Sequence, residues 1–331
     1  MTALQLITSL RGTVEKTLRP LLAGCDRLAL IDFPRYSNVG DSAIYLGELG
    51  CLRSLGLPPP AYVCDFLTYH RDQLARRLGS GTILLAGGGN FGDLWPVAQR
   101  YREEIVSSFP DNSIIQLPQT IRFEDPAALR RARSVIDAHP SFTLLVRDRR
   151  SLEIARNEFR ARSLLCPDMA FCLGPLARPV AASQDTVWLA RTDRESAGPP
   201  AARAVDWLTE PWSARRTLTE LLSRAARRRP ASEMLRDVLT TSYAPLASER
   251  LRRGCRLLSS GRAVITDRLH GHILSLLLGL PHVLLDDSYG KLSGFHQTWT
   301  AECTLGHWAD SPQEALSLAL ALIEEPREAP A

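Results

Sequence analysis

The chain has almost no lysine and no long apolar run, and both absences limit what it can be. Only Lys16 and Lys291 are lysines, so 38 of its 40 basic residues are arginines. Against 36 acidic residues the formal net charge is +4, which is too small to indicate a nucleic-acid-binding protein. The most apolar stretch, residues 271–285, is 15 residues long and contains Pro281, so it is too short to cross a bilayer. The first 16 residues lack the pattern of a secretory signal peptide.

Cysteine is also sparse. The seven cysteines are odd in number and no two have CxxC spacing, which argues against a disulfide framework and a structural zinc site. We therefore expect reduced thiols, no metal and a cytoplasmic location. With 45% hydrophobic and 23% charged residues, the composition is that of a globular protein, and 331 residues fit one large domain or two.

Short apolar runs alternate with helical patterns along the first half of the chain. Residues 27–33, 82–86 and 113–117 are typical of buried strands, and we expect Pro118 to end the third of these. The alternation indicates a parallel sheet with helices on both faces, and a second such series follows a connector at residues 173–183. The expected fold is α/β, with domains at residues 1–175 and 176–310 and a C-terminal helix and tail at residues 311–331.

Ligands of open parallel sheets bind beyond the carboxyl ends of strands, so polar residues that follow strands are candidates for a site. Asn38 and Asp41 follow the first strand, at a helix start that suits an anion or is a plain helix end capped by Asp41. Gly88, Gly89 and Asn90 follow a later strand. Consecutive glycines there permit either a close approach of a ligand or a tight turn.

Cationic residues follow other strands. Arg147 is suited to two-pronged binding of a carboxylate or phosphate, although a solvated helix start also explains it. Thr266–His272 (TDRLHGH) places an acid, an arginine and two histidines at a strand-to-helix junction. Histidines two positions apart do not share a helix face, which argues against a metal site. Lys291 stands out because this sequence uses lysine so rarely.

Seven segments, in this order, resemble the polysaccharide pyruvyl transferase family. They are NVGDSAI (38–44), LLAGGGNFGDLW (84–95), IIQLPQTI (114–121), VRDRRS (146–151), CPDMAF (166–171), TDRLHGHI (266–273) and DDSYGKLSGF (286–295). The resemblance implies two Rossmann-like domains that face each other across a cleft, as in GT-B glycosyltransferases. It also implies transfer of the pyruvyl group of phosphoenolpyruvate to two hydroxyls of a sugar, forming a cyclic ketal.

The resemblance also implies roles for individual residues. His270 is expected to act as general acid or base or to hold the departing phosphate, and Asp267 to orient His270 or to deprotonate the sugar hydroxyl. Arg147 and Arg191 are alternatives for the main anion ligand. The residues expected to bind substrate are Arg147, Arg191, Arg268, Leu269 through its backbone, Asn38, Asp41, Gly88, Gly89, Asn90 and Lys291.

The expected partners are phosphoenolpyruvate, a substrate rather than a cofactor, and a saccharide acceptor that is either a polysaccharide or its lipid-linked precursor. The arginine-rich residues 215–229 lack interleaved aromatics and form either a solvated helix face or a contact with the inner face of a membrane. Two alternatives remain open at this point: a nucleotide-sugar glycosyltransferase of the same architecture and a non-catalytic relative that binds an anion. Binding of phosphoenolpyruvate but not of nucleotide-sugars distinguishes a pyruvyl transferase from the first alternative. Turnover distinguishes it from the second.

Overall fold

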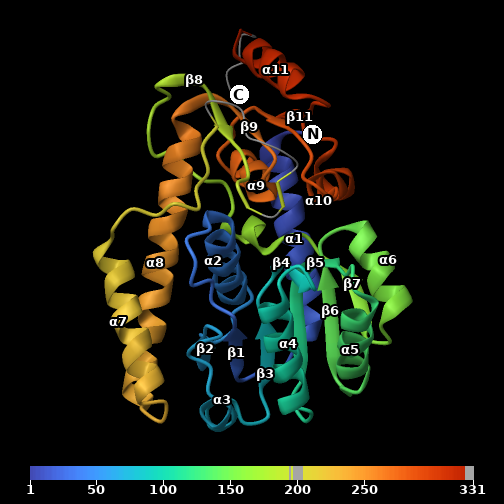
Figure 1. Cartoon of the computed structure of the whole chain (residues 1–331), viewed down its shortest axis with the longest axis vertical. Helices are drawn as coiled ribbons and strands as arrows, with labels where there is room; N and C mark the ends of the chain where they lie inside the picture. Colours follow the sequence, from blue (N-terminus) through green and yellow to red (C-terminus); the bar gives the residue numbers. More distant parts are fainter. Residues whose placement is uncertain (194, 197–203, 325–331) are drawn as a thin grey trace.

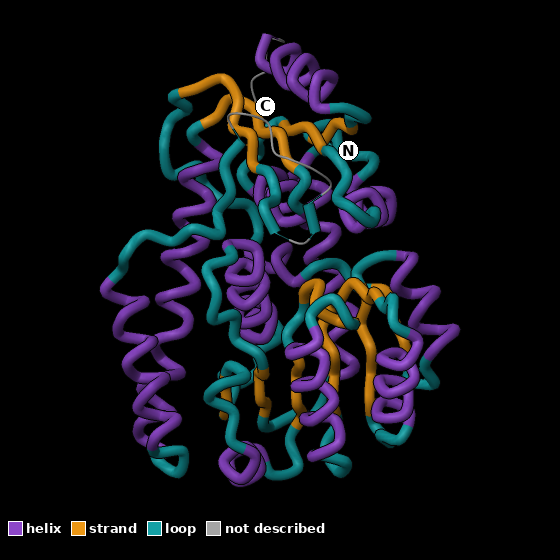
Figure 2. The backbone as a smooth tube through the Cα atoms, viewed as in Figure 1, coloured by secondary structure: helices purple, strands orange, loops and turns teal. Residues whose placement is uncertain are grey.

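The alternating apolar runs form two parallel sheets in the computed structural model, which describes residues 1–193, 195, 196 and 204–324. The sheets belong to two Rossmann-like units, one above the other, with helices around each (Figures 1 and 2). The predicted α/β class is confirmed. The tail beyond residue 324 lies outside the described residues.

The larger sheet has helices on both faces. One face packs on α3 (Arg71–Leu78), α4 (Pro96–Ser108), α5 (Pro126–Asp137) and α6 (Arg149–Glu158), and the other on α1 (Ala3–Leu21), α2 (Val39–Ser54) and α8 (Glu233–Ser259). All its pairings are parallel, so the carboxyl ends of its strands share one edge. Within the described residues its order is β2 (Tyr62–Cys64), β1 (Leu28–Ile31), β3 (Thr82–Leu85), β5 (Ile114–Arg122), β6 (Phe142–Val146) and β7 (Arg162–Leu165), with β4 (Gly88–Gly92) also beside β5.

The expectation that Pro118 ends its strand is wrong. Strand β5 continues to Arg122, and its pairing with β6 shifts register between Gln116 and Gln119. Proline cannot donate to a ladder, and a register irregularity is a place where a strand tolerates that loss. Beyond the shift β5 takes β4 as a neighbour in place of β3, which brings the glycine-rich segment to the edge of the sheet.

The smaller sheet is parallel as well. Its strands are β11 (Gly306–Trp308), β10 (His282–Leu284), β9 (Gly261–Thr266) and β8 (Gln184–Leu189), in that spatial order. Helix α9 (Leu269–Leu277) packs on one face and α11 (Pro312–Glu324) on the other. The short helix α10 (Lys291–Phe295) continues into a π-helical turn at His296–Thr300.

Two segments connect the units besides the chain crossing at residues 174–183. Helix α1 buries Leu6 and Leu10 in the core of the smaller unit and Val14 and Leu18 in that of the larger. Helix α8 returns alongside α2, and α7 (Ala214–Arg228) lies outside it at the edge of the molecule (Figure 1). The second half of the chain therefore contributes to the core of the first unit. The division between residues 175 and 176 stays a prediction.

A chain of buried histidines fixes the smaller unit. His282 Nδ1 donates to the Leu280 carbonyl at 2.8 Å, so its Nε2 accepts from His272 Nδ1 at 2.7 Å. His272 Nε2 then accepts from the Thr300 hydroxyl at 2.8 Å, and Thr300 accepts from His296 Nδ1 at 2.9 Å. In this hydrogen-bonded series the rings of His282, His272 and His296 are neutral. Burial lowers the pKa of His282 to about 4 and that of His272 well below its usual value, with neighbouring histidines adding to the effect.

We expect this histidine chain to make the protein acid-labile. As the pH falls from about 6.5 to about 4, His282 takes up a proton in the unfolded protein but stays neutral in the folded protein. The free energy of unfolding should fall by about 3 kcal/mol across that window for this residue. Urea unfolding at pH 7.5 and pH 5.0 should show about 2 kcal/mol of this loss, and His282→Asn should reduce its size. A loss of equal size in His282→Asn would contradict the assignment.

Candidate active site

The carboxyl edges of the two sheets meet at a cavity of about 770 Å3 between the units. Ten of the twelve predicted site residues line it, although they are spread over more than 250 positions of sequence. Of the two that do not, Gly88 packs against α2, where a Cβ would lie 3.6 Å from Ile44. Asp267 accepts a hydrogen bond from the Arg191 backbone N–H at 2.8 Å, which ties the end of β9 to the end of β8.

Arg147 and His270 come from different units and meet at one carboxylate, that of Asp168. Arg147 Nη1 donates to Asp168 Oδ2 at 2.6 Å, and His270 Nε2 lies 3.4 Å from the same oxygen. Burial alone would raise the pKa of Asp168, but the charges and hydrogen bonds of His270 and Arg147 outweigh it and hold that pKa below its usual range. Asp168 is therefore ionised and orients both side chains.

The other side of the His270 ring rests on the start of α2. A Cβ on Gly40 would lie 2.4 Å from His270 Nδ1, so the helix backbone approaches the ring in a way that only glycine permits. Helix α2 begins at Val39, and Asn38 is its N-cap, accepting from the Gly40 N–H at 3.0 Å. The interpretation of Asp41 as the cap is wrong. Its carboxylate instead accepts from Asn38 Nδ2 at 2.7 Å and lines the cavity.

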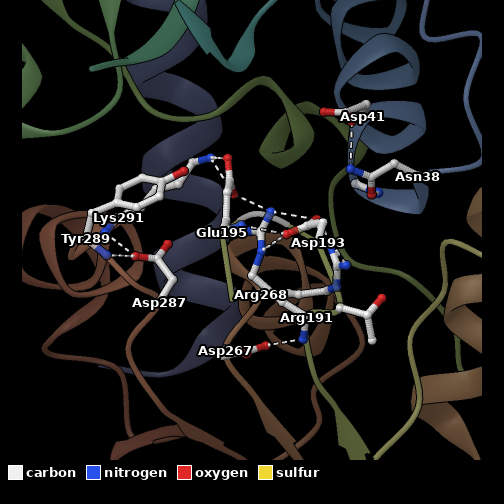
Figure 3. A network of polar contacts seen from close by, with 12 residues as sticks. Asn38, Asp41, Arg191, Asp193, Glu195, Asp267, Arg268, Asp287, Tyr289 and Lys291 are labelled. Carbon is white, nitrogen blue, oxygen red and sulfur yellow. Dashed lines mark hydrogen bonds and ion pairs between the residues drawn. The ribbon is translucent and has the colours of Figure 1, made fainter. Parts of the chain in front are cut away.

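Three further cations come from the smaller unit, and carboxylates lie between them (Figure 3). Glu195 bonds Lys291 Nζ at 3.2 Å and forms an ion pair with Arg191, which also binds Asp193 at 2.9 Å. Arg268 pairs with Asp206 and, at 3.4 Å, with Asp193. Burial opposes ionisation of Glu195, but Lys291 and Arg191 outweigh it and lower its pKa to about 2. Burial lowers the pKa of Lys291, against the opposing effect of Glu195.

The glycine-rich segment of the larger unit lies in close contact with a residue of the smaller unit. A Cβ on Gly89 would lie 2.3 Å from Lys291 Nζ and 3.0 Å from Arg147 Nη2. Asn90, next in the chain, accepts from Arg102 Nη2 at 2.7 Å and donates to Asp32 Oδ2 at 3.4 Å. The segment is therefore not a tight turn: it forms strand β4 at the sheet edge and brings its backbone against two cations of the site, and a close approach to a ligand stays a prediction.

Acidic residues that sequence reasoning missed line the part of the cavity formed by the larger unit. Asp32 directly follows β1 and has a left-handed φ of 80°, a strained conformation of the kind that gathers at functional sites. Burial raises its pKa to about 6, against the opposing charge of Arg102. Glu48 of α2 is also buried at the cavity. Position after a strand could have indicated Asp32, and Asp168 lies in a quoted motif, but Glu48 looks in sequence like any mid-helix glutamate.

The family model for polysaccharide pyruvyl transferases matches residues 38–289, about three quarters of the chain. The chain belongs to the polysaccharide pyruvyl transferase family. Among its members, Pyruvyl transferase 1 of Schizosaccharomyces pombe is 34% identical over 314 residues, which cover 90% of this chain and 76% of that protein. EpsO of Bacillus subtilis, a proposed pyruvyl transferase, is 31% identical over 275 residues, which cover 81% and 84% of the two chains.

A solved structure shares the fold of this pyruvyl transferase family member. It is that of a functionally uncharacterised protein from Klebsiella pneumoniae, with a TM-score of 0.61, 16% identity, and coverage of 90% of this chain and 99% of that one. At this identity the likeness concerns the fold alone. No described helix is long and apolar enough to cross a membrane, and the described residues hold no group of three or more His, Cys, Asp or Glu placed to bind a metal ion.

Proposed function

We propose that this protein transfers the pyruvyl group of phosphoenolpyruvate to two hydroxyls of a sugar in a polysaccharide or its lipid-linked precursor, forming a cyclic ketal. The single observation that carries this proposal is the convergence of Arg147, Arg191, Arg268 and Lys291 with His270 on one cavity between the units. The donor brings a phosphate and a carboxylate to be neutralised together, and a cavity with several cations on its walls suits such a ligand.

The position of Glu195 supports this reading of the cations. Its carboxylate lies between Lys291 and Arg191, in the place where a carboxylate or phosphate of a ligand would make the same contacts. A charge-assisted hydrogen bond contributes roughly 1.5–3 kcal/mol net. Two or three of them correspond to affinities between roughly millimolar and micromolar. Arg191 and Arg147 remain alternatives for the strongest anion contact.

The chemistry needs one proton at the methylene carbon of the donor and the departure of phosphate from the neighbouring carbon. His270, held by Asp168 at the cavity wall, is placed either to exchange a proton with a hydroxyl or to hold the phosphate as it leaves. Asp267 faces the backbone of Arg191, and its proposed part is to hold the end of β9, and with it the His270 segment, in place.

Donor binding tests the proposal directly. Calorimetry and thermal-shift assays with phosphoenolpyruvate and with a panel of nucleotide-sugars make the test. We expect phosphoenolpyruvate to bind and the nucleotide-sugars not to bind. A ligand at 100 times its Kd adds about 2.7 kcal/mol of stability, which a thermal shift resolves. Release of inorganic phosphate that depends on added saccharide then tests turnover. Stabilisation by a nucleotide-sugar and not by phosphoenolpyruvate would overturn the proposal, and donor binding without turnover would make the protein a non-catalytic relative.

A lipid-linked acceptor would bring the protein to a membrane surface through α7. This helix exposes Leu218 and Leu221 to solvent, together with Arg224, Arg227 and Arg228. Apolar and cationic side chains on one exposed helix suit the surface of an anionic bilayer. Co-sedimentation with vesicles that contain phosphatidylglycerol should exceed that with neutral vesicles and should be lost when the three arginines become glutamate. Equal binding to both kinds of vesicle would contradict the contact.

A further inference from the structure

Glu48 is a buried carboxyl group at the cavity. It pairs with none of the cations that are proposed to bind the donor. It lies one and two helical turns beyond Ile44 and Asp41 on α2, and all three residues line the cavity. Only 1% of its surface is exposed. A glutamate this far from solvent is rare unless it is paired with a cation, and among the described residues Glu48 forms no ion pair or hydrogen bond with one.

The two oxygens of Glu48 differ in their surroundings. Oε1 accepts from the backbone N–H of Gly87 at 2.8 Å, which fixes the side chain against the end of β3. Oε2 is buried and has no hydrogen-bond partner among the described residues. Leaving a buried polar atom unpaired costs about 1–3 kcal/mol, and such an atom in a folded protein calls for an explanation. A glutamine or leucine would serve a purely structural role here at lower cost.

The groups that face Glu48 keep it protonated. Asp41 and Tyr45 lie on the same helix as Glu48, Asp32 follows β1, and Asp168 follows β7. Burial raises the pKa of Glu48 to about 8, the three carboxylates add to this, and the Gly87 N–H opposes it. At neutral pH the group is a carboxylic acid, and its second oxygen, which has no partner among the described residues, can carry the proton.

The donor has one uncharged end, and the wall that carries Glu48 suits it. Phosphate and carboxylate are drawn to Arg147, Arg191, Arg268 and Lys291, whereas α2 has no basic residue between Val39 and Leu52. We expect the methylene carbon of a donor held in this way to face the wall where Ile44 and Glu48 lie, because that wall has no cation to attract the charged ends. Resting on the proposed function, we propose that Glu48 is the acid that protonates the methylene carbon of phosphoenolpyruvate.

The proton balance of this step closes within the site. The O–H bond of Glu48 breaks as the electron pair of the enol double bond forms the new C–H bond, which leaves an oxocarbenium centre at the neighbouring carbon. The first sugar hydroxyl adds there, and its proton restores Glu48. The bond from that carbon to the phosphate oxygen then breaks. The second hydroxyl closes the ketal and its proton leaves on the phosphate, so His270 remains free to act at the phosphate.

Glu48→Gln tests the assignment, because glutamine keeps the size of the side chain and an acceptor for the Gly87 N–H but has no acidic proton. We expect kcat to fall at least about 100-fold while the Kd of phosphoenolpyruvate, measured by calorimetry, changes less than about threefold. Glu103→Gln is the matched control. Glu103 is likewise a buried helical glutamate of the first unit, but it pairs with Arg131 and does not line the cavity, so its kcat should stay at the wild-type value.

The pH profile gives a second readout that a structural role would not move. Wild-type kcat should fall above about pH 8 as Glu48 loses its proton, and the residual turnover of Glu48→Gln should lack that fall. Should the glutamine variant not fold, Glu48→Asp, which retracts the acid by one methylene, should move the alkaline limb. Wild-type kcat in folded Glu48→Gln, or an unchanged limb in either variant, would overturn the inference. Absence of ketal formation by the wild type would instead overturn the proposed function.

Discussion

Replacing His270 with alanine is expected to lower turnover by at least about 100-fold in a protein that remains folded. The ring lies between Asp168 and the backbone of Gly40 at the cavity wall, where its contacts are with the site rather than with a hydrophobic core. Its removal should therefore cost catalysis far more than stability. Steady-state kinetics with thermal unfolding beside it makes the measurement.

The pattern of the loss distinguishes the two roles open to His270. A fall in kcat with an unchanged Kd for phosphoenolpyruvate indicates that His270 exchanges a proton. A fall in kcat together with a higher Kd indicates that His270 holds the phosphate. His307→Ala is the control, since His307 lies in β11 away from the cavity and should leave both constants unchanged. Near-normal kcat in folded His270→Ala would remove His270 from the mechanism.

Replacing Arg147 with methionine is expected to weaken both the fold and donor binding. The sequence predicts only that Arg147 binds the donor. The structure adds that Arg147, 1% exposed, neutralises a carboxylate that is equally buried. Removing one partner of a buried pair costs roughly 3–5 kcal/mol because the other charge is left uncompensated. Urea unfolding measures this loss, and calorimetry should show donor binding weakened at least tenfold.

A double variant separates the two effects of Arg147. In Arg147→Met with Asp168→Leu the carboxylate that Arg147 neutralised is removed as well, so at least half of the lost stability should return while donor affinity stays low. Arg191→Met is the comparison for the donor. Should Arg147→Met bind phosphoenolpyruvate as tightly as wild type while Arg191→Met does not, the main anion contact belongs to Arg191.

Sequence patterns located the edge of the site well because that edge follows from sheet topology. Parallel strands end at one edge, so Arg147 and the His270 segment could be expected at the cavity before any coordinates. The sequence did not predict which residues these side chains contact. The link between Arg147 and His270 runs through Asp168, and its identity depends on how the two units are set against each other, which no local pattern contains. Pro118 misled for a similar reason, since a change of neighbouring strand accommodates it.

By itself the sequence determined the α/β class and the motifs that carry the family, because apolar periodicity and strand-end glycines are local properties of the chain. Only the tertiary structure decided the surroundings of each acidic group in the site. Glu48 and Asp41 have the same formal chemistry and lie on one helix, yet Glu48 is buried against Gly87 and near three carboxylates, whereas Asp41 accepts from Asn38. Protonation depends on solvent exclusion and on neighbours brought from distant segments, and folding alone supplies both.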